Sequence, residues 1–271
     1  IYMKKNKTFL LSLFSLLFMY GCDLIDYHPY DVDISGETGI NAKNMAKIES
    51  NCKGKTTIKF AVMGDSQRWY DETEEFVKHI NRRNDIDFVI HGGDVSDFGI
   101  TKEFLWQRDI LNGLKFPYVV IIGNHDVLGT GEEVYTKVFG EDNFSFIAGN
   151  VKFVCLNTNA IEYDYSHPVP DFDFIENALA DRKDEYSKTV FSMHVRPLIH
   201  EFNNNVAKVF HRYVKEAPGI QFCTAAHEHH LTAEAIFEDG IMYYGSDSMN
   251  HRSYLVFTIN PEGYEYEVVY F

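Results

Sequence analysis

Short apolar runs alternate with amphipathic helical segments from about residue 57 onward. Runs at 58–64, 87–92, 117–123, 152–158, 188–194 and 220–226 each have the length of one buried strand. Helical periodicity predicts helices near 72–83, 102–113, 132–139 and 171–182, and a further one whose apolar face runs from Val206 to Ala217. Residues 230–271 are strand-rich, with turns at 238–240 and 260–263. This rhythm predicts an α/β (α+β) fold, a four-layer α/β/β/α sandwich of two mixed sheets flanked by helices.

The chain is long enough for one substantial domain. It has 271 residues, of which 45% are hydrophobic, and α/β domains of this size commonly form a single unit. Residues 22–56 are turn-rich and lack a sustained apolar period. We therefore expect a tether over residues 22–56 and a single folded domain over residues 57–271.

The first residues have the layout of a signal peptide. Three lysines precede an apolar run from Phe9 to Tyr20, and Gly21 and Cys22 follow it. This run is shorter than the roughly 20 residues that a membrane-spanning helix needs. A cysteine after a small residue resembles the lipobox of bacterial lipoproteins, so residues 1–21 are expected to be removed and Cys22 to carry the lipid. A hydrophobic helix in the domain core is the alternative.

Net charge limits the possible partners. The formal charge is −15, and removal of residues 1–21 takes away three lysines and no acids, which gives −18. Binding of a long nucleic acid depends on lysine and arginine neutralising phosphates, so a long DNA or RNA partner is not expected. A small phosphorylated substrate remains compatible, because bound metal ions can supply positive charge locally.

Polar clusters follow five of the predicted strands. They read GDSQ at 64–67, GGDVSD at 92–97, GNHD at 123–126, MHVRP at 193–197 and AAHEHH at 225–230. In α/β sheets, ligands bind outside the carboxyl ends of the strands, so these clusters should converge. Each cluster alone also fits a helix cap or a structural histidine. Their order along the chain is the more specific signal.

Taken in this order, the clusters resemble the five-motif signature of the calcineurin-like metallophosphoesterases, over residues 57 to about 259. The resemblance implies two metal ions, of Mn, Fe or Zn, because carboxylate and amide oxygens and imidazole nitrogens suit them. One ion would be held by Asp65, Gln67, Asp94 and His229. The second would be held by Asp94, Asn124, His194 and His227. Asp94 would bridge the two ions.

The resemblance also implies a catalytic pair, His125 and Asp97. Asp97 would orient the imidazole, and His125 would stabilise charge on the phosphoryl group or protonate the leaving alkoxide. A hydroxide held by the two metal ions would attack phosphorus in line. Arg196 is the candidate substrate-binding residue, because a guanidinium matches phosphate oxygens.

Two positions depart from the commonest family pattern. Gln67 stands where many members have histidine, and its neutral amide is a weaker ligand that can instead hydrogen-bond a water on the metal. Ala226 stands where the last motif usually begins with glycine, and its methyl group constrains the turn slightly.

These features predict metal-dependent hydrolysis of a phosphomonoester or phosphodiester by a lipid-anchored enzyme. It would work in the bacterial cell envelope, at the inner or the outer membrane. One alternative is a binding or scaffold lipoprotein that keeps the fold and has lost the chemistry. A nuclease is another, which the acidic charge disfavours.

Overall fold

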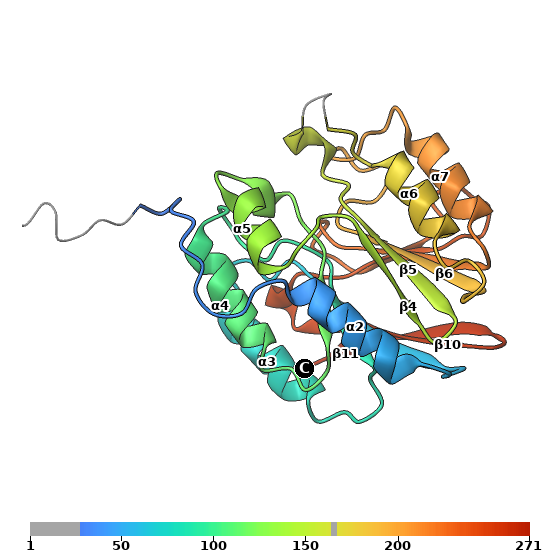
Figure 1. Ribbon diagram of the computed structural model, residues 1–271, viewed down its shortest axis with the longest axis horizontal. Coiled ribbons are helices and arrows are strands. Elements are labelled where there is room, and N and C mark those ends of the chain that lie inside the picture. Colours follow the sequence, from blue (N-terminus) through green and yellow to red (C-terminus); the bar gives the residue numbers. More distant parts are fainter. Residues whose placement is uncertain (1–27, 164–166) are drawn as a thin grey trace, which may run out of the picture.

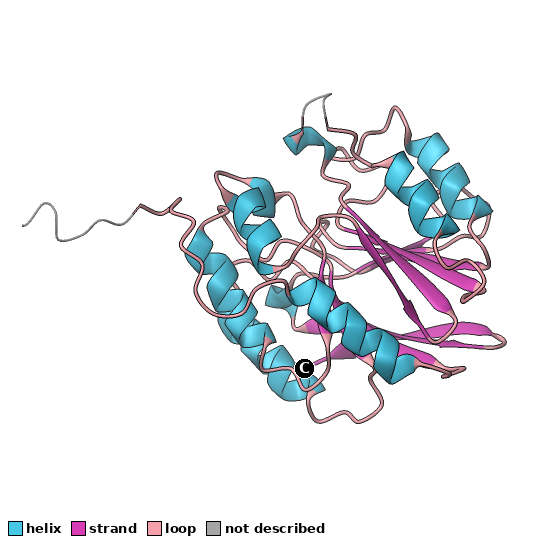
Figure 2. Ribbon diagram, viewed as in Figure 1, coloured by secondary structure: helices cyan, strands magenta, loops and turns pink. Residues whose placement is uncertain are grey.

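Two β-sheets lie face to face, with helices on both outer faces (Figures 1 and 2). The computed structural model describes residues 28–163 and 167–271, so Cys22 and residues 1–21 lie outside the described residues. The first sheet has the order β11-β10-β1-β2-β3, and the second has the order β4-β5-β6-β7-β9-β8. Both sheets combine parallel and antiparallel pairs. The predicted four-layer sandwich of two mixed sheets is confirmed.

The strands and helices follow the alternation that the sequence predicts. The strands are β1 (Ile58–Met63), β2 (Phe88–His91), β3 (Tyr118–Val120), β4 (Phe144–Ala148), β5 (Val151–Leu156), β6 (Lys188–Met193), β7 (Ile220–Ala225), β8 (Thr232–Glu234), β9 (Tyr243–Gly245), β10 (Ser253–Asn260) and β11 (Gly263–Tyr270). The helices are α2 (Ile40–Cys52), α3 (Tyr70–Ile80), α4 (Thr101–Leu111), α5 (Gly131–Val138), α6 (Phe172–Ala180) and α7 (Ala207–Glu216). None of these helices is long and apolar enough to cross a membrane.

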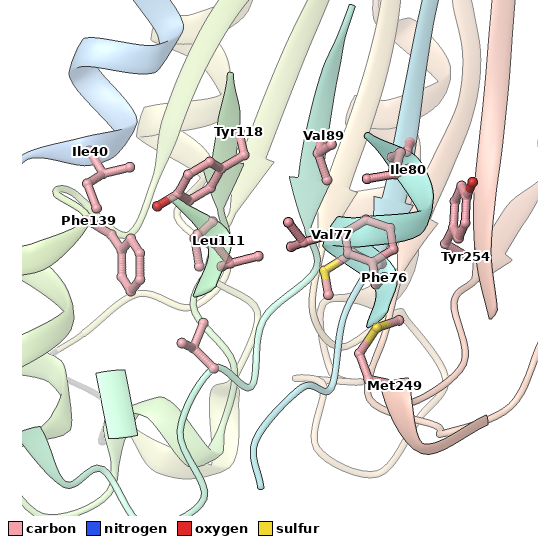
Figure 3. Packing of buried hydrophobic residues seen from close by; sticks show 14 of the residues in the cluster. Ile40, Phe76, Val77, Ile80, Val89, Leu111, Tyr118, Phe139, Met249 and Tyr254 are labelled. Carbon is pink, nitrogen blue, oxygen red and sulfur yellow. The ribbon is translucent and has the colours of Figure 1, made fainter. Parts of the chain in front are cut away.

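Alternation along each strand divides the apolar side chains among three cores. In β1, Phe60 and Val62 point between the two sheets, whereas Ala61 and Met63 point toward the outer helices. Figure 3 shows the layer beneath those helices, where Phe76 of α3 packs near Tyr254 of β10. A third cluster joins α6 and α7 to the second sheet. Burial on both faces of each sheet fixes the strand register.

The strands that carry the predicted motifs end at one edge of the sandwich. β1, β2 and β3 run parallel in the first sheet, and β6 and β7 run parallel in the second. The two sheets approach each other closely at this edge. A Cβ atom added to Gly64 or to Gly92 would lie only 3.0 Å from the Cβ of Ala226. Glycine in the first sheet thus leaves room for the methyl group of Ala226.

Part of the predicted tether belongs to the folded domain, which corrects the expectation for residues 22–56. Residues Ile40–Cys52 form α2, and Ile48 and Cys52 are fully buried in the core between the sheets. The apolar period is weak because polar residues occupy part of the buried face. Asn41 and Asn44 are both buried.

The two asparagines bind the edge strand β3. Asn41 donates from Nδ2 to the carbonyl of Val120 (2.8 Å) and accepts at Oδ1 from the Val120 amide (2.9 Å). Asn44 donates to the carbonyl of Tyr118 (2.8 Å). An edge strand otherwise presents unpaired peptide groups, so these side chains take the place of a neighbouring strand.

Replacing Asn41 by alanine should lower the free energy of unfolding by about 1–3 kcal/mol, because the buried amide of Val120 loses its acceptor and the Val120 carbonyl keeps only the Tyr135 hydroxyl as a donor. Urea denaturation of Asn41→Ala measures this loss. Asn51→Ala is the matched control, since Asn51 is exposed in the same helix. Equal stability of the two variants would contradict a bracing role for α2.

Candidate metal centre

The predicted metal ligands come together where the strands end. Asp65 follows β1, Asp94 follows β2, His194 follows β6, and His227 and His229 follow β7. Two groups arise, Asp94 with His194 and His227, and Asp65 with Asp94 and His229. Within each group the potential ligand atoms lie within 4.8 Å of one another. Asp94 belongs to both groups.

Asn124 completes the group that contains the two more buried histidines. Its Oδ1 lies 3.0 Å from His194 Nε2 and 3.0 Å from His227 Nδ1. His194 donates from Nδ1 to the carbonyl of Gly92 (2.8 Å), so its Nε2 faces Asn124 and Asp94. Four residues therefore direct a nitrogen or oxygen atom at one point.

The other group is more open. His229 Nε2 lies 3.4 Å from Asp65 Oδ1, and the His229 side chain is 46% exposed. Gln67 is buried beside these residues, and its amide nitrogen donates to Asp94 Oδ2 (2.9 Å). In this arrangement Gln67 orients the shared carboxylate, which differs from the expected role as a direct ligand.

The ligand loops hold strained backbone conformations. Asp65, Asp94, His227 and His229 all have positive φ angles, of 49°, 58°, 74° and 53°. Such angles are rare for residues with a side chain and persist only where surrounding structure enforces them. Hydrogen bonds from the amides of Ser66 and Gln67 to the carbonyl of Asp94 (3.1 and 3.0 Å) provide part of that enforcement.

Asp126 joins two of the loops and has no counterpart among the predicted site residues. Its carboxylate is buried and accepts from the amides of Val95 (3.2 Å), Ser96 (2.8 Å) and Gly123 (2.9 Å). The loops that carry Asp94 and Asn124 are thereby held together. Its place as the last residue of GNHD is the only sequence signal for this role.

His125 lies beside the ligands, but its contact with Asp97 differs from the expected one. Its Nδ1 donates to the backbone carbonyl of Asp97 (2.8 Å), and the Asp97 carboxylate is 3.8 Å from Nδ1. That carboxylate pairs with Arg68 at 2.5 Å. Arg68 directly follows GDSQ, and its side chain is 58% exposed. Sequence reasoning did not select it.

Arg196 is not free to bind phosphate in this structure, which corrects its predicted role. Its guanidinium is buried and pairs with Glu228 through two nitrogens, one at 3.0 Å, and with Glu234 at 3.4 Å. Glu228 stands between His227 and His229 in the chain. Arg196 therefore fixes the turn that presents these two histidines.

The charged forms of Asp94 and His194 stabilise each other. Burial opposes the charged form of both Asp94 and His194, but their proximity lowers the pKa of Asp94 and raises that of His194. A hydrogen bond that the His229 ring donates to the Asp65 carboxylate raises the pKa of His229. Carboxylate oxygens, an amide oxygen and imidazole nitrogens around one shared acid form a donor set that fits divalent metal ions.

A family model described as calcineurin-like phosphoesterase matches residues 58–231. The chain belongs to the calcineurin-like phosphoesterase family. This family typically binds divalent metals. The match begins at the first residue of β1 and includes all the candidate ligands, whereas α2 precedes it.

Several solved structures share the fold. The chain matches GAP50, the anchor in the inner membrane complex of Plasmodium, with a TM-score of 0.59 and 12% identity over 80% of this chain and 85% of that chain. It matches purple acid phosphatase PPD1 from yellow lupin with a TM-score of 0.58 and 13% identity, over 79% and 52%. It also matches a putative 5'-nucleotidase from Staphylococcus aureus, with a TM-score of 0.56 and 15% identity over 79% of this chain and 54% of that chain. No curated protein matches the sequence.

Metal binding should release protons near neutral pH. The pKa of His194 is raised to about 9 and that of His229 is raised above its usual value, so in the metal-free protein both rings are more protonated than a free imidazole, and a metal ion must displace those protons. Affinity for Mn²⁺ should therefore fall as pH is lowered from 8 to 6. Calorimetry in buffers of different ionisation enthalpy should detect release of about one to two protons per chain. Binding without proton release would contradict this electrostatic description.

Proposed function

We propose that this protein hydrolyses a phosphomonoester or phosphodiester at a centre of two metal ions. The observation that supports the proposal is that Asp94 belongs to two convergent ligand groups. One ion would bind Asp94, Asn124, His194 and His227. The other would bind Asp65, Asp94 and His229, with Gln67 holding Asp94 in place. A complete donor set in the family fold favours hydrolysis over a scaffold that has lost its chemistry.

The reaction adds one water across a phosphorus–oxygen bond. The ions would hold phosphate oxygens and lower the pKa of the attacking water. The bond from phosphorus to the leaving oxygen breaks, and this oxygen takes a proton. His125 is suited to supply it, because its Nδ1 is fixed by the carbonyl of Asp97 and its backbone amide is held by Asp94 Oδ1 at 3.0 Å.

Arg68 replaces Arg196 as the proposed contact to the substrate. It reaches Asp97 beside His125, and it remains partly exposed to solvent. A phosphate group at the metal centre can compete with Asp97 for the guanidinium, since arginine binds phosphate oxygens in bidentate geometry. Asp97 would then hold Arg68 in place until the substrate arrives.

The cellular setting is a further part of the proposal. Lipid attachment at Cys22 would place the domain in the bacterial cell envelope, at the inner or the outer membrane, with residues 23–39 between the lipid and α2. The formal charge of −15 favours a small phosphorylated substrate over a long nucleic acid.

The proposed activity is tested with purified protein supplied with Mn²⁺, Zn²⁺ or Fe²⁺. Turnover is expected on an aryl phosphate or a bis-aryl phosphate. Asn124→Ala and His125→Ala should each lower turnover roughly 100-fold or more, since the first removes a ligand and the second removes the proton donor.

His230→Ala is the matched control for these two variants. His230 lies beside the same ligand loop, its side chain is 61% exposed, and both of its ring nitrogens face Glu228. Its loss should change turnover less than threefold. Absence of hydrolysis with every ion, or full activity of both Asn124→Ala and His125→Ala, would refute the proposed function.

Substitution of Arg68 should weaken substrate binding without weakening metal binding. Arg68→Ala is expected to raise KM about tenfold, which corresponds to roughly 1.4 kcal/mol, because one charged contact to phosphate is lost. Arg212→Ala serves as control, since Arg212 lies exposed on α7. An unchanged KM for Arg68→Ala, or an equal rise in KM for Arg212→Ala, would exclude Arg68 from the substrate contact.

A further inference from the structure

A carboxylate outside the motifs contacts one of the proposed ligands. Glu201 lies in the segment that follows β6, seven residues after His194. Its Oε2 is 3.1 Å from His227 Nε2. The segment is anchored on both sides of this contact, because the carbonyl of Glu201 accepts from the amide of Ala160 (3.1 Å) and the ring of Phe202 is buried.

The two nitrogens of His227 therefore face different groups. Nδ1 lies 3.0 Å from Asn124 Oδ1, within the group that contains Asp94 and His194. Nε2 faces Glu201. A metal ion needs the lone pair of Nδ1, so the ring must carry its proton on Nε2. A carboxylate acceptor at Nε2 favours this tautomer and fixes the orientation of the ring.

The other two histidines differ in whether their second ring nitrogen has a hydrogen-bond acceptor. His194 donates from Nδ1 to the carbonyl of Gly92, which leaves Nε2 for the metal. His229 is nearly half exposed, and within residues 28–163 and 167–271 its Nδ1 makes no hydrogen bond. Both histidines of one group thus have an acceptor at the nitrogen that faces away from the proposed ion, whereas Nδ1 of His229 has none within the described residues.

We propose that Glu201 is a positioning residue that sets the metal affinity of the group formed by Asp94, Asn124, His194 and His227. This inference rests on the proposed metal centre. Glu201 acts through His227 and does not contact the substrate. It makes this group the tighter of the two sites, which fills first as the metal concentration rises. The Asp65 and His229 group is the weaker site and fills second.

Calorimetric titration of the full chain with Mn²⁺ tests this proposal. Wild-type protein should show two unequal binding events. Glu201→Ala should weaken the tighter event by about 10–100-fold, as removal of such a partner typically does. Glu201→Gln should weaken it less, because the amide oxygen still accepts from Nε2. In Zn²⁺-loaded protein, ¹⁵N NMR should find the His227 proton on Nε2 in the wild type, with this preference reduced in Glu201→Ala.

Asp239→Asn provides a matched control. Asp239 Oδ2 lies 2.9 Å from Nε2 of His211, which makes the same kind of imidazole–carboxylate pair on the outer face of the second sheet. Its substitution should lower the melting temperature of the protein and leave both metal affinities unchanged. Glu201→Ala should show the opposite pattern, with lower affinity and a small change in the melting temperature of the metal-free protein.

The outcomes separate this inference from the proposed function. If wild-type protein binds no metal, the proposed centre fails. If wild-type protein binds two ions and Glu201→Ala binds them equally well, only the role of Glu201 is overturned. The role of Glu201 is also overturned if Asp239→Asn loses as much metal affinity as Glu201→Ala does. The effect would then reflect general destabilisation of the protein.

Discussion

The buried carboxylate of Asp94 is the group on which the rest of the site depends. It sits at a positive φ angle, accepts from the amide of His125 and the side chain of Gln67, and faces His194. An ionised carboxylate in such a place is costly unless charges and donors surround it. Loops from both sheets supply those partners, so the sandwich and the centre are stabilised by the same contacts.

Local patterns predicted the fold and the convergence of the candidate ligands, because each signal lies within a few residues. A strand that is buried on both faces appears as an apolar run, and the motif at its end appears as polar letters directly after it. GNHD, for example, predicts both the end of β3 and the place of Asn124. Parallel strand direction then brings such ends to one edge of the sandwich.

Other features could not be predicted because they depend on contacts between distant parts of the chain. Arg196 has the right chemistry for phosphate, but Glu228 takes its guanidinium, and the sequence does not place these two residues side by side. Asp97 similarly turns its carboxylate to Arg68 and offers His125 its carbonyl. α2 escaped detection because its buried face is partly polar. In each case the partner, and not the residue type, determines the role.

The asparagines of α2 also concern the boundaries of the domain. The family match begins at residue 58, yet β3 obtains partners for its outer edge from Asn41 and Asn44. A fragment that begins at the family boundary would leave peptide groups of β3 bare at the edge of the first sheet. Such an edge can pair with a strand from another molecule, so the preceding helix also guards the domain against self-association.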